Sequence, residues 1–260
     1  MKHAAIVVTI LLAVFVSTSS AFANAAGQVE RPATPPGWRE VMSKSFDLTL
    51  AGKHTELIAI YEKWVAKYPN FFEARMMLGG AHENLGREVL VSGAADAAAK
   101  SVKHFEAAVV HFRRALELPG ADFGAMRVLI DVHGAVGLNR PEEYERLVYV
   151  GLTQYPAEPG AHAYLMALLA TKQVPLDSAV RAALAAVPKG PDARATIAGM
   201  LYHFARDDRN GAEAVLRVAL QFIEEALKID PKHAYALREK ARILEEQARR
   251  KSPAQAACAD

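Results

Sequence analysis

Breaks of proline and glycine between helix-forming segments are the feature that most constrains this fold. Between residues 38 and 250, nearly every apolar stretch repeats at three- and four-residue intervals, the spacing of one face of an α-helix. No stretch alternates apolar and polar residues for long enough to indicate a strand. The prolines that close successive segments are Pro69, Pro119, Pro156, Pro188 and Pro231. The sequence therefore predicts an all-α chain of short helices joined by turns.

One stretch of the chain carries a recognisable first helix of a repeat. Leu78 and Gly79, followed by Gly86, resemble helix A of a tetratricopeptide repeat, whose pattern W-x2-L-G-x2-Y ends at a glycine. Arg75 and His82 stand where that pattern has Trp and Tyr, so two large packing residues are replaced. The resemblance implies that this helix ends at Gly86.

The second helix of such a repeat has its best match near the C-terminus. Ala219, Ile223, Ala226 and Pro231 follow the pattern A-x3-F, then A, then P. Two other segments repeat this spacing, namely Ala108, Phe112, Ala115 and Pro119 in one, and Leu57, Tyr61, Trp64 and Pro69 in the other. The chain is therefore similar to exported bacterial proteins of the tetratricopeptide repeat (TPR) family over about 210 residues.

This resemblance implies a right-handed α-solenoid of about five TPR-like helical hairpins plus a C-terminal capping helix. The first helices of the hairpins are expected at 38–51, 72–86, 125–136, 161–172 and 192–206. The expected cap, 234–250, carries charges on nearly all sides, which suits the end of a stack.

Two second helices are expected to be unusually long. The distance from Gly86 to Ala108 exceeds a short turn, so the second helix of that hairpin is expected to begin near Ala94 and run to Leu118. The stretch 211–229 is expected to form another long helix. Such helices could serve as a docking platform or dimer contact, or be a tolerated extension of the surface.

The first 23 residues have the parts of a secretory signal peptide. Lys2 precedes an apolar run over 4–16, and Ala23 or Ala25 offers a small residue for cleavage. The run is shorter than the roughly 20 apolar residues that span a bilayer. No cysteine follows it, which excludes a bacterial lipoprotein anchor. We expect a periplasmic or secreted protein without stable membrane insertion after cleavage, with an uncleaved anchor as the alternative.

These boundaries divide the chain into a signal peptide (1–23), a Pro-rich linker (24–37), a helical repeat domain (38–250) and a disordered tail (251–260). Cys258 is the one cysteine, so the chain forms no internal disulfide, and both a free thiol and a bond to another molecule stay open. Lys and Arg total 31 against 29 Asp and Glu, a balance that gives no attraction to nucleic acid.

The sequence lacks the motifs of the common enzyme classes. It contains no G-x-S-x-G, no P-loop and no G-x-G-x-x-G. His82 and Glu83 do not continue into the metalloprotease pattern H-E-x-x-H, while His104 and His111 lie seven residues apart without a third ligand nearby. We therefore expect no metal, no cofactor and no enzymatic activity.

In the TPR family, side chains of the first helices line a concave groove. The resemblance implies a binding surface at the corresponding positions, of which the leading candidates are Glu73, Met76, Glu83, Asn84, Arg127, Asp131, Tyr202 and His203. The other positions are Phe46, Thr49, Ala163, Ala167 and Thr171. This groove would suit a neutral or mixed-charge peptide.

The expected function is a protein–protein interaction scaffold of the cell envelope, binding a protein or peptide partner through the groove or the overlong helices. The alternative is an accessory component of periplasmic transport or envelope assembly, because periplasmic TPR proteins associated with tripartite (TRAP) transporters look similar. A third reading is an enzyme built on the same scaffold. The partner and the oligomeric state stay open.

Overall fold

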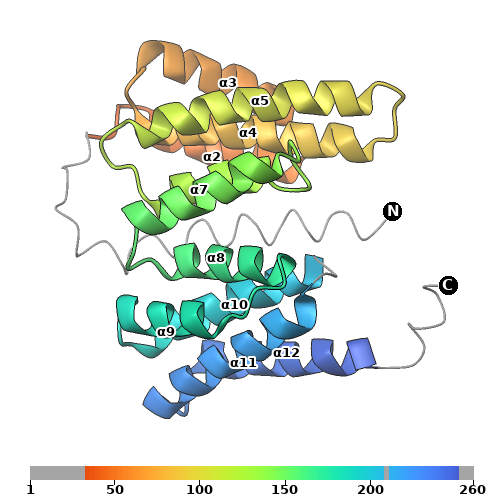
Figure 1. Ribbon diagram of the computed structural model, residues 1–260. Coiled ribbons are helices and arrows are strands. Elements are labelled where there is room, and N and C mark those ends of the chain that lie inside the picture. Colours follow the sequence, from red (N-terminus) through yellow and green to blue (C-terminus); the bar gives the residue numbers. More distant parts are fainter. Residues whose placement is uncertain (1–32, 208–210, 252–260) are drawn as a thin grey trace.

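The computed structural model describes residues 33–207 and 211–251, and within them the secondary structure is entirely helical (Figure 1). The predicted signal peptide, most of the predicted linker and Cys258 lie outside the described residues. The helices are α2 (Trp38–Leu50), α3 (His54–Lys67), α4 (Phe72–Val91), α5 (Ala97–Leu116), α6 (Phe123–His133), α7 (Pro141–Gln154), α8 (Pro159–Thr171), α9 (Asp177–Ala186), α10 (Pro191–Asp207), α11 (Ala212–Ile229) and α12 (Ala234–Lys251). None of these helices is long and apolar enough to cross a membrane.

Consecutive helices pack as pairs, and the pairs stack along one direction (Figure 1). The pairs are α2 with α3, α4 with α5, α6 with α7, α8 with α9, and α10 with α11. The final helix α12 packs against both α10 and α11. Towards the C-terminus the first helices also contact one another, α6 with α8 and α8 with α10. The predicted all-α architecture of five hairpins and a capping helix is confirmed.

The buried apolar residues form three regions along the stack, which we call N-terminal, central and C-terminal. These regions are continuous because some helices contribute residues to two of them. Helix α4 contributes Leu78 to the N-terminal region and Met76 to the central region. Helix α8 contributes Tyr164 to the central region and Met166 to the C-terminal region. Each hairpin therefore buries apolar surface against its neighbours as well as within itself, as repeat architectures require.

Glycines bring α4 and α5 into close contact. A Cβ atom added at Gly79 would lie 2.4 Å from Cε1 of Phe112, and one added at Gly86 would lie 2.9 Å from Cε1 of Phe105. The aromatic rings thus occupy the space that a side chain on α4 would need. The two Phe side chains are fully buried.

The expected helix end at Gly86 is wrong, and this packing explains why. Helix α4 continues through Gly86 to Val91, because the glycine serves the contact with Phe105 and does not end the helix. The chain turns instead near Gly93, whose φ of +71° favours glycine. A long α5 is confirmed, although it begins at Ala97 rather than near Ala94.

The length of α4 was not predicted. Helices α4 and α5 have 20 residues each, whereas α6 has 11 and α7 has 14. In Figure 1 the α4–α5 hairpin accordingly extends past its neighbours at one side of the stack. Helix α11, with 18 residues, is long as expected, and α10 nearly matches it with 17.

Two adjacent glycines of α4 provide a direct test of the packing. Gly79→Ala should lower the free energy of unfolding by about 1–3 kcal/mol, because its Cβ overlaps the ring of Phe112. Gly80→Ala should raise it by about 0.5–1 kcal/mol, because an added Cβ there meets nothing within 4 Å. Urea denaturation of both variants measures the difference, and equal stabilities would contradict the close contact.

Candidate functional site

Three helices bring together a set of charged and polar side chains that we call the polar cluster. Its members are Glu83 and Arg87 on α4, Arg127 and Asp131 on α6, and Tyr164 on α8. On α4 and on α6 the two members are four residues apart, so each pair lies on one face of its helix. The cluster thus contains two cationic and two acidic side chains around one phenol.

Hydrogen bonds hold the cluster in place. Nη2 and Nε of Arg87 donate to Oε1 of Glu83, at 2.7 and 3.1 Å. The hydroxyl of Tyr164 donates to Oδ1 of Asp131, which joins α8 to α6. The Glu83 side chain is 15% exposed and that of Arg87 is 30% exposed, whereas Tyr164 is buried. Arg127 and Asp131 are half-buried as well, so solvent reaches the cluster on both α4 and α6.

Burial changes the acid–base properties of the cluster. It raises the pKa of Glu83, an effect that the neighbouring Arg87 opposes. It also raises the pKa of Asp131, against the effects of Arg127 and of the Tyr164 hydroxyl. Burial and the charge of Asp131 hold the pKa of Tyr164 well above its usual value. The arginines thus oppose the preference for the protonated form that burial gives to the two carboxyl groups.

Aromatic rings surround the phenol of the cluster. The ring of Tyr164 lies edge-on to Phe204 of α10, with 4.8 Å between ring centroids, and also contacts Phe123 of α6. These contacts fix the ring, so its hydroxyl presents a fixed donor to Asp131. They also place the cluster beside α10.

The structure brings together three of the predicted binding residues and separates the others. Glu83, Arg127 and Asp131 belong to the polar cluster, and Asn84 follows Glu83 on α4. Met76 is buried in the core. The other leading candidates are half-buried and lie outside the cluster, Glu73 at the start of α4 and both Tyr202 and His203 on α10.

The remaining predicted positions differ in exposure. Ala163 and Ala167 are buried, so their positions on α8 serve packing. Phe46 and Thr171 are exposed. The hydroxyl of Thr49 donates to the backbone carbonyl of Ser45 within its own helix, at 2.8 Å.

Sequence reasoning missed two members of the cluster. Arg87 had a usable signal, because it follows Glu83 by four residues on a helix, a spacing typical of ion pairs. Tyr164 had no such signal in the sequence, because its partner Asp131 is 33 residues away and only the packing of α8 on α6 brings the two together.

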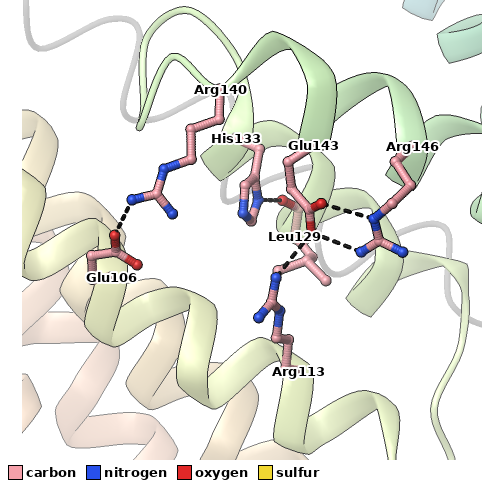
Figure 2. A network of polar contacts seen from close by, with 7 residues as sticks. All are labelled: Glu106, Arg113, Leu129, His133, Arg140, Glu143 and Arg146. Carbon is pink, nitrogen blue, oxygen red and sulfur yellow. Dashed lines mark hydrogen bonds and ion pairs between the residues drawn. The ribbon is translucent and has the colours of Figure 1, made fainter.

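A second polar network links α5 to α7 and to the turn that precedes α7 (Figure 2). Glu143 accepts hydrogen bonds from Nε of Arg146, at 2.8 Å, and from Nη2 of Arg113, at 2.9 Å. Arg146 and then the other nearby cations lower the pKa of Glu143 to about 2. Arg140 donates to Glu106 beside it. These contacts connect the α4–α5 hairpin to the α6–α7 hairpin.

Three histidines meet between α4 and α5. Nδ1 of His82 lies 3.2 Å from Nδ1 of His104, and the rings of His82 and His111 stack with 5.8 Å between centroids. Burial lowers the pKa of all three, and that of His111 falls to about 4 with added effects of His82 and Arg75. Within residues 33–207 and 211–251, no group of three or more His, Cys, Asp or Glu side chains is arranged to hold a metal ion.

Comparison with known proteins finds structural likeness but no relative in sequence. No family model matches the chain, and no curated protein matches it in sequence. Among solved structures it is similar to the crystal structure of YrrB, described as a TPR protein with an unusual peptide-binding site. The two share 17% sequence identity with a TM-score of 0.37, and the match covers 77% of this chain and 90% of that chain.

The stacked histidines should make the fold sensitive to mild acid. Because the folded-state pKa of His111 is about 4, against an ordinary 6.5, the unfolded chain binds the proton first as pH falls. Stability should therefore be complete above about pH 6.5 and decline as pH approaches 4. For the partly exposed His111 the loss between pH 7 and pH 5 should be on the order of 1 kcal/mol.

Urea denaturation at pH 7 and pH 5 measures this loss. His111→Gln should reduce the difference between the two pH values, because the residue that resists protonation is gone. The same pH dependence in His111→Gln as in the wild type would contradict the role of His111.

Proposed function

We propose that this chain is a protein-binding scaffold of the cell envelope, which holds a protein or peptide partner at the polar cluster. The observation that carries the proposal is the arrangement of four charged side chains, two of each sign, on the adjoining helices α4 and α6. This cluster contains three of the residues that the repeat pattern singled out for binding.

The geometry suits recognition of a partner with both charge signs or with polar uncharged groups. Glu83 and Arg87 hold each other by two hydrogen bonds and are still partly exposed. Side chains that are already ordered lose little conformational freedom on binding, which favours affinity. A guanidinium beside a carboxylate offers donors and acceptors within one small area, as a peptide backbone with mixed side chains requires.

The proposed location in the envelope rests on the N-terminal segment. The charged start, the short apolar run and the small residues near Ala23 support export to the periplasm or the medium. A binding partner would then be another exported or envelope protein.

The cluster offers binding groups rather than a catalytic set. Its members are two arginines, two carboxylates and a phenol whose pKa lies far above neutrality. Both carboxylates are matched with a cation, so neither is arranged as a free general base. We therefore propose no enzymatic activity.

Affinity capture from envelope extract tests the proposal. The chain from residue 24 onward, as bait, should retain a specific protein. The double substitution Glu83→Gln plus Arg87→Gln should reduce the retained amount at least about tenfold, equivalent to a loss of about 1.4 kcal/mol in binding. Changing both partners avoids leaving one buried charge unpaired.

The matched control is Glu143→Gln plus Arg146→Gln, which removes an ion pair of the same kind from α7. The control should capture as much as the wild type, and thermal unfolding should show that both variants fold. Equal capture by the wild type and the cluster variant would contradict binding at the polar cluster.

A further inference from the structure

Helix α12 has an apolar outer face. Four residues at intervals of four, three and four fall on one side of the helix and are exposed: Leu237, Ala241, Leu244 and Ala248. Leu237 is 46% exposed and Leu244 is 47% exposed. This spacing forms a straight seam along a helix, of the kind through which two helices pair. We call these four residues the leucine stripe.

The inner face of α12 is more polar than the leucine stripe. It buries Glu239 and Glu246 on either side of Ile243. Nη1 of Arg242 donates to Glu239 at 3.1 Å, and Glu246 accepts from Arg249 and Arg250. The helix therefore turns two of its three glutamates inward and both leucines outward. The last helix of a stack needs a polar outer face, which α12 lacks along this seam.

We infer that the leucine stripe pairs with the same stripe of a second copy of this chain, with the two α12 helices antiparallel. A two-fold axis between Ala241 and Leu244 places each alanine opposite a leucine of the partner copy. Ala241 then faces the partner's Leu244, and Ala248 faces the partner's Leu237. A small residue would meet a large one in every layer.

The packing inside the chain follows the same rule. On α4, Gly79 and Gly86 face the rings of Phe112 and Phe105 on α5, so small and large residues alternate between paired helices. The antiparallel α12 pair would repeat that arrangement between two copies. Because a two-fold contact uses the same surface of both copies, it would also cover both leucines of each copy.

Charges beside the stripe are complementary under the same two-fold axis. At 100° per residue, Arg238 and Glu245 lie on one flank of the stripe, and Lys240 and Gln247 lie on the other. In an antiparallel pair each flank meets itself, so Glu245 approaches the partner's Arg238, and Lys240 approaches the partner's Gln247. No like charges stand directly opposite each other in these four contacts.

The contacts that Glu245 and Arg238 make within their own copy leave both side chains accessible to a second copy. Glu245 has no ion pair within the described residues, and its side chain is exposed. Arg238 reaches Glu239 at 3.4 Å and remains 60% exposed. The remaining arginines of α12 contact Glu239 and Glu246 in their own copy.

Sedimentation equilibrium of the chain from residue 24 onward, with Cys258 kept reduced, tests the inference. The wild type should show a concentration-dependent equilibrium between monomer and dimer, because a contact between single helices is small compared with standard interfaces of about 1,600 Å². Leu237→Glu and Leu244→Glu should each weaken dimerisation at least about tenfold, since pairing would bury an unpaired carboxylate. Thermal unfolding of these monomers should match that of the wild type at concentrations where the wild type is also monomeric, because both positions are exposed.

The matched control is Val110→Glu, which places the same acid at an apolar position of α5 that is 62% exposed. It should leave dimerisation unchanged. A wild type that stays monomeric at every concentration, or a dimer unaffected by the leucine substitutions, would overturn the inference. A monomer whose leucine stripe instead captures a different protein would overturn the assignment of a second copy.

The orientation has its own test. Glu245→Arg should weaken dimerisation several-fold through repulsion from the partner's Arg238, whereas Lys240→Glu should leave it nearly unchanged. In a parallel pair Lys240 would face the partner's Glu245, so both substitutions would weaken the dimer and combining them would restore it. That second pattern would overturn the antiparallel arrangement. These outcomes do not depend on the polar cluster, which involves α4, α6 and α8.

Discussion

The stack depends on glycines that let an aromatic ring from another helix contact the helix backbone. This contact recurs along the chain, since Gly79 meets Phe112, Gly160 meets Phe123 and Gly199 meets Tyr235. A Cβ at Gly160 would lie 2.4 Å from the ring of Phe123, and one at Gly199 would lie 2.2 Å from the hydroxyl of Tyr235. These contacts set how closely helices approach, both within a hairpin and between hairpins. Protein interiors are too densely packed to absorb an added methyl group there without a shift.

The polar cluster follows from that close stacking. Carboxylates on α4 and α6 lose water because neighbouring helices cover them, and this burial alone would favour their protonated forms. Arg87 and Arg127 offset the cost by lying beside them. A buried ion pair adds little net stability compared with an apolar pair of similar size. The cluster is therefore poorly explained as a stabilising device, which supports the binding role that we propose for it.

The sequence predicted the number and order of helices because helical spacing and prolines act locally. It failed at Gly86 because a glycine can end a helix or admit a neighbouring ring, and only the position of Phe105 decides between them. For the proposed site, the repeat pattern selected Glu83, Arg127 and Asp131, which the structure brings together, but also Met76, which is buried in the core. Tyr164 could not be found, because its bond to Asp131 exists only once α8 packs on α6.

The most direct measurement of the central claim is site-specific photocrosslinking in the native envelope. A photoreactive phenylalanine analogue at Gly80 would sit one turn before Glu83, in a position where an added Cβ meets nothing within 4 Å. The same analogue at exposed Val110 on α5 serves as the control. Binding at the polar cluster predicts one discrete adduct from position 80 and none from position 110. Adducts from position 110 alone, or from neither position, would contradict it.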